Sequence, residues 1–268
     1  MSSTLQVEAR EPKPRMIVPH SVRGTLISIS GLIVGAGIWE LVGRHTQQSS
    51  FAPFSKTISA FWGMTKSGQL PRALESSLEL FGAGLGIAIV LGFFIGLLLA
   101  RIRTLRIGLE PYILMLYATP MFALIPFILS LFGFEFRAKV IVVALFGIWP
   151  ILINTLEGAR SVNLDLLEVA RSYRSTEPKL WRHVVIPYTL PYTMTGVRQG
   201  IARSLIGVIA SEYLLAATGL GNLILTYTNQ FDASHVLAAV LAITLVATLL
   251  MMIGRAIENY FARWKAGV

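Results

Sequence analysis

Long apolar runs alternate with short charged segments along the 268 residues of the chain. A helix rises about 1.5 Å per residue and the hydrocarbon layer of a membrane is about 30 Å thick, so about 20 apolar residues are enough to cross it. Six runs approach this length, at residues 25–42, 80–100, 111–134, 140–156, 188–218 and 236–254. The pattern therefore predicts an all-α, polytopic membrane protein with about six transmembrane helices.

The run 111–134 contains two prolines, Pro120 and Pro126, which should kink or break its helix because each lacks a backbone N–H group. A broken helix frees carbonyl groups that need partners or water, which makes this run a candidate pore lining. Its candidate residues are Met115, Thr119 and the two prolines. Ordinary kinked packing explains the same pattern equally well.

The run 188–218 is interrupted by Arg198, Arg203 and Glu212. Charges inside a span are costly and usually face protein or water, so this helix is expected to line a pore or a contact between subunits. Arg203 and Glu212 are therefore candidate pore or gate residues. For Glu212 the alternative is a structural hydrogen bond near the outer gate.

Residues 43–77 separate the first two runs. The stretch 51–77 is too polar to span a membrane, and its large apolar side chains recur at nearly helical spacing. These side chains are Phe51, Phe54, Ile58, Phe61 and Trp62. We expect an amphipathic helix that lies on the outer face of the membrane.

The loop 157–187 is the longest polar segment between the later runs. Leu166, Val169, Ala170 and Tyr173 make an apolar stripe at helical spacing. Asn163 can cap the start of a short helix, a second start signal follows at Ser175-Thr176-Glu177-Pro178, and Pro187 is expected to close the segment. Two short helices at an angle are predicted, and their apolar stripe either docks on a partner or rests on lipid headgroups.

The composition agrees with a lipid environment, because 54% of the residues are hydrophobic and only 14% are charged. Cysteine is absent, so neither a disulfide nor a thiolate metal site can form. The four histidines, His20, His45, His183 and His235, lie far apart in sequence. No metal site and no cofactor are therefore expected.

The net charge of +9 comes from small basic groups between the apolar runs, a distribution that orients a membrane protein and does not indicate nucleic acid. With a cytoplasmic N-terminus, fifteen Lys and Arg residues fall on the cytoplasmic side and six outside. Tails 1–24 and 255–268 are thus both expected in the cytoplasm.

Motifs of enzyme chemistry are missing, including a Gly-rich loop that ends in Lys-Ser/Thr and paired acids that face a histidine. The glycines at 82, 84 and 86 lie inside an apolar run and lack the spacing of a nucleotide-binding fingerprint. Like the pairs Gly31/Gly35 and Gly92/Gly96, they are expected to let helices approach closely.

A family resemblance extends the interpretation. Glu168-Val169-Ala170-Arg171-Ser172-Tyr173-Arg174, followed by Val184-Val185-Ile186-Pro187, resembles the Glu-Ala-Ala (EAA) loop of ABC importer permeases. Gly196-x-Arg198, Glu212 and Gly219-Leu220-Gly221 are similar to the nitrate, sulfonate and taurine branch of that family. The resemblance covers residues 76–263 and implies a type I importer permease (MetI-like) fold, with a permease core at 78–254.

The resemblance also implies the partners. In this family two permease subunits, usually copies of one chain, form the pore in the bacterial inner membrane. A separate cytoplasmic ATPase hydrolyses ATP, so this chain would not be an enzyme. A periplasmic or lipid-anchored binding protein delivers a small solute, which in similar permeases is a sulfonate, nitrate, bicarbonate, a pyrimidine precursor or an aromatic acid.

The residues expected to couple to the ATPase are carried over from the EAA loop. They are Asp165, Leu167, Glu168, Ala170, Arg171, Arg174 and Pro187. Glu168 would make a polar contact while Leu167 and Ala170 fill the ATPase cleft. Gly219, Leu220 and Gly221 are candidate contacts for the binding protein.

Two departures from the EAA pattern stand in the loop. Val169 replaces the second residue of Glu-Ala-Ala, and Arg174 stands where the family has glycine. Arginine adopts a positive φ less readily than glycine, so either Ser175 and Thr176 take over the turn or the fit to the ATPase is altered.

Two other functions remain as alternatives. A secondary transporter driven by an ion gradient predicts inverted repeats and acidic residues at mid-membrane, whereas Glu212 lies off-centre in its run and the sequence shows no internal repeat. A membrane assembly subunit that transports nothing would use the loop 157–187 as a tether.

Overall fold

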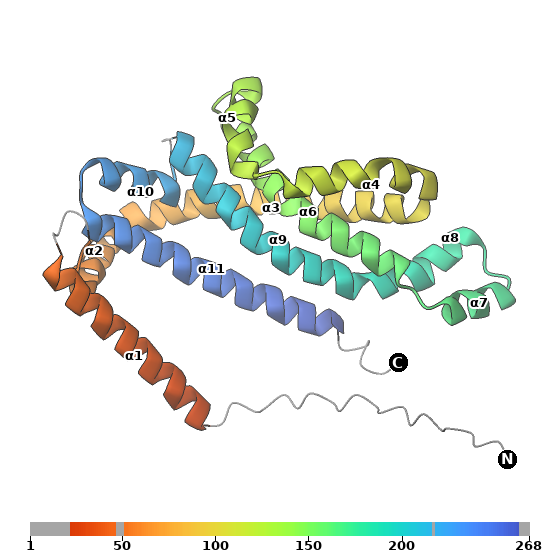
Figure 1. The fold of residues 1–268 in the computed structure, drawn as a ribbon, viewed down its shortest axis with the longest axis horizontal. Helices are drawn as coiled ribbons and strands as arrows, with labels where there is room; N and C mark the ends of the chain where they lie inside the picture. The colour runs from red at the N-terminus through yellow and green to blue at the C-terminus, as the bar shows by residue number, and fades with distance from the viewer. Residues whose placement is uncertain (1–21, 47–50, 216–217, 263–268) are drawn as a thin grey trace, which may run out of the picture.

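The computed structural model describes residues 22–46, 51–215 and 218–262, and this part of the chain is helical without strands. The elements in chain order are α1 (Val22–His45), α2 (Phe54–Lys66), α3 (Gln69–Arg101), α4 (Arg103–Ala118), α5 (Met121–Phe132), α6 (Phe136–Arg160), α7 (Leu164–Ser172), α8 (Glu177–Leu180), the π-turn (Trp181–Val185), α9 (Ile186–Leu215), α10 (Leu220–Asn229) and α11 (Ala233–Ala262). The predicted all-α fold is confirmed (Figure 1). Residues 1–21 of the predicted N-terminal tail lie outside the described residues.

Four described helices are long and apolar enough to cross a membrane: α1, α3, α6 and α11. The pair α4 and α5 makes a fifth crossing if the two helices form one broken span. The remaining predicted span corresponds to α9, which has 30 residues and carries the charges at 198, 203 and 212.

The centre of the bundle is α6, which packs against α3 on one side and α9 on the other. Glycines make this approach possible. A Cβ atom on Gly92 would lie 3.0 Å from Ile151, and one on Gly96 would lie 2.8 Å from Thr155. Gly84 meets Val143 even more closely. The predicted helix packing is thus confirmed at these three glycines of α3.

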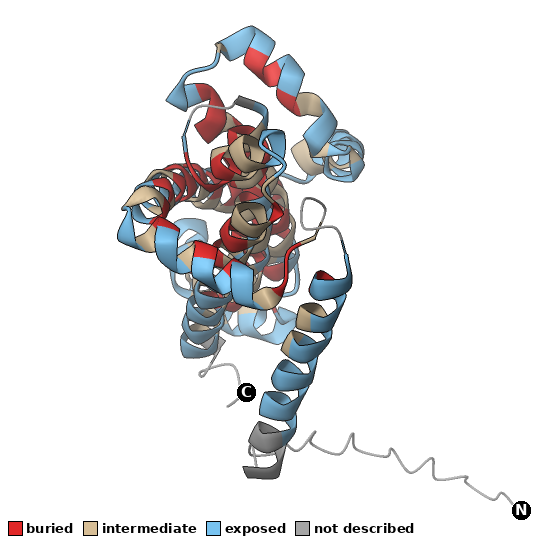
Figure 2. Cartoon of the chain, turned by 90° about the vertical axis from the view of Figure 1, so that its left-hand side faces the viewer, coloured by how far each residue is buried: buried red, intermediate tan, exposed pale blue. Residues whose placement is uncertain are grey.

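The same prediction is wrong at Gly31, Gly35, Gly82 and Gly86, where an added Cβ would meet nothing within 4 Å. The first two lie on α1, which is almost entirely exposed and stands apart from the bundle (Figure 2). The other two lie on faces of α3 that α6 does not cover.

α1 is attached to the rest of the chain through α2. The indole nitrogen of Trp39 donates a hydrogen bond to the carbonyl of Ala52 at 3.1 Å, and its ring meets Phe54 edge-on at 5.3 Å. The carboxylate of Glu40 accepts from the Ser55 backbone N–H at 2.9 Å and so satisfies one free donor at the start of α2.

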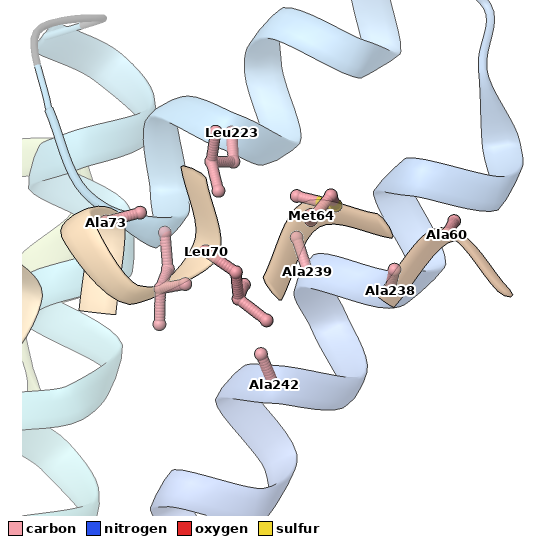
Figure 3. Close-up of a cluster of buried hydrophobic side chains, with 9 residues drawn as sticks. Ala60, Met64, Leu70, Ala73, Leu223, Ala238, Ala239 and Ala242 are labelled. Carbon is pink, nitrogen blue, oxygen red and sulfur yellow. The ribbon is translucent and has the colours of Figure 1, made fainter. Parts of the chain in front are cut away.

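The expected amphipathic helix over residues 51–77 is instead divided. α2 ends at Lys66, Gly68 turns the chain with φ of 75°, and α3 starts at Gln69 and continues without a break through the second apolar run. Ala60 and Met64 of α2 are buried against α3, α10 and α11 (Figure 3). The side of α2 that rests on protein carries Thr57, Ala60 and Met64, whereas Ile58 and Trp62 of the expected apolar face are exposed.

The predicted break in the run 111–134 is confirmed at Pro120, where α4 and α5 meet at an angle of 100°. Pro126 lies within α5 without ending it. In Figure 1, α5 projects away from the bundle, and Ile125 at its middle is fully buried in a cluster with residues of α6 and α9.

The contact between α3 and α6 gives a test of stability. Gly96→Leu should lower the free energy of unfolding by about 1–3 kcal/mol or more, because its side chain would have to displace Thr155 and the helix backbone. Gly86→Leu, on an open face of the same helix, should change it by less than about 0.5 kcal/mol. Denaturant unfolding in detergent micelles measures both, and equal effects would contradict the assigned packing.

Candidate functional site

The loop 157–187 forms the end of the bundle opposite α2 and α10 (Figure 1). The two predicted short helices are present as α7 and α8. Asn163 caps α7 as expected, because its side chain accepts a hydrogen bond from the Asp165 backbone N–H at 2.9 Å. α8 begins at Glu177 with Pro178 in its first turn. The predicted start signals of both helices are confirmed.

One face of α7 packs on the rest of the chain. Leu167 and Ala170 lie against a cluster formed by Val162, Leu180 and Val185, which are all buried. Leu167 and Ala170, which are expected to fill the cleft of another protein, are here half-buried against residues of the chain itself. They hold α7 to the end of α6 and to the π-turn.

The opposite face of α7 is open. Leu164, Val169 and Tyr173 are 72%, 55% and 83% exposed; Leu164 begins the nine-residue helix, and Val169 and Tyr173 lie one turn apart at its end. Asp165, Glu168, Arg171 and Arg174 are also exposed. Sequence periodicity placed Val169 and Tyr173 on the stripe correctly and could not show which side of α7 the chain itself would cover.

The turn after α7 is made by Arg174 itself, which adopts φ of 52°. The Ser175 N–H donates to the Ala170 carbonyl at 3.1 Å and the Arg174 N–H to the Arg171 carbonyl at 2.8 Å, which is the Schellman arrangement that glycine normally completes. Ser175 and Thr176 therefore do not take over the turn. The left-handed backbone is retained without glycine.

Pro187 does not close the segment. The chain passes from α8 through the π-turn directly into α9, and Pro187 lies in the first turn of α9. In the π-turn the Ile186 N–H reaches the Trp181 carbonyl, five residues back, and this wider turn accommodates the proline that lacks an N–H. α7, α8 and α9 thus form a chain of helices that is not interrupted at Pro187.

The charges of α9 have separate partners. The guanidinium of Arg198 donates to Glu258 of α11 at 2.6 Å, and the Thr195 hydroxyl donates to the same carboxylate at 2.7 Å. Both charged groups are partly shielded from solvent, so this pair fixes α9 to α11. Glu258 had not been identified from sequence, because it follows the last apolar run.

Glu212 is buried, with 1% of its surface exposed. The Ser77 hydroxyl lies 2.8 and 2.9 Å from its two carboxylate oxygens, and the Gly221 N–H donates to it at 3.0 Å. Lys139 of α6, which is also buried, adds a favourable positive charge. In this conformation the Glu212 side chain does not line a pore, and the alternative of a structural hydrogen bond applies.

Gly219, Leu220 and Gly221 fold inward over Glu212 and are buried. Gly219 has φ of 93°, and a Cβ there would overlap the Glu212 carboxylate. The Leu220 N–H donates to the Ser77 hydroxyl at 2.9 Å. The assignment of these three residues as an exposed contact for a binding protein is therefore corrected.

The pore candidates of the broken run lie near α9. The Arg203 guanidinium stands 5.5 Å from the ring centre of Tyr117, directly before the break at Thr119 and Pro120. Arg203 is exposed. Phe122, just after the break, lines an apolar cavity of about 610 Å³ against α9, and Arg203 is not among the residues that line it. Met115 and Pro126 are exposed on α4 and α5.

Two residues at the core of this arrangement were missed. Ser77 lies in the polar part of α3 and pairs with a carboxylate 135 residues away, for which a single sequence carries no signal. Trp181 stacks with Arg101, whose guanidinium lies 5.7 Å from its ring, and so ties α3 to the π-turn. The only local indication of a role for Trp181 was the pair of basic residues that follows it, Arg182 and His183.

The model of the family described as binding-protein-dependent transport system inner membrane component matches residues 88–266. The putative aliphatic sulfonates transport permease protein SsuC of Escherichia coli is 32% identical over 213 residues, 78% of this chain and 79% of that protein. The formylaminopyrimidine transport permease protein ThiX of Halalkalibacterium halodurans is 29% identical, over 85% of this chain and 91% of that protein.

The nitrate import permease protein NrtB of Leptolyngbya laminosa is 27% identical over 87% of this chain and 86% of that protein. Among solved structures, an inward-facing form of the MetNI methionine ABC transporter is similar with a TM-score of 0.63 and 18% identity. The match covers 72% of this chain and 96% of that one. This likeness shows that the fold is shared.

The left-handed turn at Arg174 gives a second test. Arg174→Gly should stabilise the turn by about 1 kcal/mol, because glycine has no Cβ to strain at φ of 52°. Hydrogen exchange of the amides between residues 164 and 176 should slow about fivefold. Arg174→Ala removes the charge and keeps the strain, so it should give no such gain, and a gain as large as that of glycine would show that charge is the cause.

The Ser77 contact gives a third test. Ser77→Ala leaves the Leu220 N–H without its acceptor and removes one donor to Glu212, so the free energy of unfolding should fall by about 1–3 kcal/mol. Ser76→Ala is the matched control, because that hydroxyl bonds Thr218 at the exposed surface. Its effect should stay within about 0.5 kcal/mol in the same denaturant titration.

Proposed function

Because the chain belongs to the family of binding-protein-dependent transport system inner membrane components, it is a permease subunit of an ABC transporter, and we propose that α7 is where a separate cytoplasmic ATPase acts on it. The observation that carries the proposal is the exposed apolar face of α7. A helix of nine residues is too short to be stable by itself and needs surfaces on both sides. The permease covers one side, and the ATPase is proposed to cover the other.

The contact is proposed to have an apolar centre and a charged rim. Val169 and Tyr173 supply the centre, and Glu168 and Arg174 stand beside them. Buried aromatic anchors carry most of the energy of such contacts, while charges at the rim select the partner. Asp165 is nearer the start of α7, where its charge favours the helix.

Motion of α7 would be transmitted to the spans as one body. Leu167 and Ala170 hold α7 to the end of α6, and the π-turn leads without interruption into α9. α9 is fixed to α11 through Arg198 and to α3 through Glu212. We therefore propose that closure of the ATPase tips this group of helices between inward-open and outward-open states.

The solute path is proposed to follow the side of α9 that carries Arg203. This residue is exposed and stands beside the break at Pro120, and Phe122 just after the break lines the 610 Å³ cavity against α9. A second copy of the chain facing this side would enclose the path. Arg203 would attract an anion, which agrees with relatives named for sulfonates and nitrate. A pyrimidine precursor is the alternative, after the relative ThiX.

Gly219, Leu220 and Gly221 are buried and offer the binding protein little surface. The binding protein is proposed to contact the exposed turn between α10 and α11 instead. Phe231 in this turn is 77% exposed and has φ of 55°. An exposed aromatic residue on a strained backbone agrees with a contact surface. On the orientation given by the positive residues, this turn faces the outside of the inner membrane and both termini lie in the cytoplasm.

A reconstituted complex tests the proposal. Liposomes that contain the permease and its ATPase should take up an isotope-labelled alkanesulfonate, nitrate or bicarbonate only when ATP and the binding protein are both present. Uptake driven by an ion gradient without ATP would indicate a secondary transporter. Binding of the ATPase without uptake of these three solutes or of a pyrimidine precursor would indicate an assembly subunit.

Variants of α7 locate the contact. Tyr173→Asp or Glu168→Arg should lower both ATPase binding and ATP-dependent uptake at least about tenfold, because each places an unfavourable charge at the proposed interface. Tyr260→Asp is the control, since Tyr260 near the end of α11 is 69% exposed and lies outside α7. Full binding and uptake by the α7 variants would overturn the proposed coupling role.

A further inference from the structure

A cavity of about 360 Å³ lies where the ends of α3 and α6 meet the loop 157–187. Three arginines line it: Arg106 from α4, Arg160 from the last turn of α6 and Arg171 from α7. Trp181, which also lines the cavity, lies under the guanidinium of Arg101. The cavity thus concentrates positive charge from four different elements.

Two of the three arginines have no ion-pair partner among the described residues. Arg160 is paired with Glu157 at 3.0 Å, and Glu177 also lines the cavity. Arg106 and Arg171 have no carboxylate within 4.0 Å among the residues that the structure describes, and their guanidinium groups donate no hydrogen bond there. Arg106 is half-buried and lines the cavity.

The floor of the cavity is apolar. Val162, Leu180 and Val185 are buried in it, and Leu167 packs beside them. A site for a free inorganic anion needs no such floor, because hydration and charge decide its affinity. A cavity with cationic walls and a hydrocarbon floor fits an amphiphile whose anionic group and apolar chain lie side by side.

The position of the cavity agrees with this chemistry. Ala100 stands at the end of α3, the longest of the four apolar helices, and Ala159 stands at the end of α6. The apolar part of both spans therefore ends at the cavity. On the proposed orientation this level is the headgroup region of the cytoplasmic leaflet, where anionic lipids are enriched and basic pockets bind their headgroups.

We propose that this cavity binds the phosphate of an anionic phospholipid through Arg106 and Arg171, with the start of its acyl chain on the apolar floor. Guanidinium groups bind phosphate oxygens in pairs, which suits two arginines that lack other partners. The inference rests on the proposed orientation. A bound lipid would connect the first turn of α4 to α7 and so restrain the helix on which the ATPase is proposed to act.

The test uses the full chain in nanodiscs of phosphatidylcholine that contain a graded fraction of phosphatidylglycerol. Native mass spectrometry counts the phosphatidylglycerol molecules that stay bound to the protein. The variant Arg106→Gln/Arg171→Gln should weaken retention about tenfold. Arg174→Gln is the matched control, because Arg174 is exposed on the same loop and does not line the cavity, and it should change retention less than twofold.

Two further arms separate the sources of the effect. Arg106→Lys keeps the charge and the fold and loses the paired donors, so it should fall between the parent and the double variant. Inorganic phosphate added to 10-fold excess over lipid should not displace phosphatidylglycerol, because it cannot use the floor.

Three outcomes would overturn the inference. Equal losses for Arg174→Gln and the double variant would show that general surface charge holds the lipid. Displacement by inorganic phosphate would show a free-anion site. Unchanged retention in the double variant, together with lost binding of the ATPase, would assign the two arginines to the ATPase contact and leave the proposed function standing.

Discussion

The close packing of α6 between α3 and α9 is the interaction on which the other features depend. Within lipid a helix gains little from burying apolar side chains, so van der Waals contact at short distance and polar links must hold the spans together. Gly92 and Gly96 allow the first, and the Glu212 to Ser77 link supplies the second. Both act between segments that are far apart in sequence. The bundle is thereby a body that can move as a unit.

This rigidity allows the loop 157–187 to transmit motion to the spans. A lever needs a stiff connection to the part it moves and a free surface for the part that moves it. The inner face of α7 and the continuous passage into α9 provide the connection, while Val169 and Tyr173 remain free. By contrast, α1 is attached only near Trp39 and Glu40 and lies outside this body. The chain thus contains both a rigid group of spans and a peripheral one.

Features that depend on neighbouring residues could be predicted from the sequence, whereas contacts between distant segments could not. The cap at Asn163 and the break at Pro120 follow from the chemistry of one residue and its neighbours, so both could be predicted. The burial of Leu167 depends on residues of the π-turn and α6, which periodicity cannot supply. The sequence leaves open how the turn after α7 is made, and in the structure Arg174 itself adopts a positive φ beside the two hydrogen bonds of the turn. For Glu212 both alternatives were foreseen, and only the position of Ser77 decides between them.

The carboxylate of Glu212 occupies the volume in which a side chain of residue 219 would stand. The two positions therefore cannot vary independently during evolution, because any side chain larger than hydrogen at 219 requires a shorter one at 212. A shorter side chain at 212 would leave the Ser77 hydroxyl and the Gly221 N–H without their acceptor. Among homologous permeases these positions are expected to change together or to stay fixed together. A pairwise correlation of this kind would result from steric fit, and it could arise even where neither residue ever touches the transported solute.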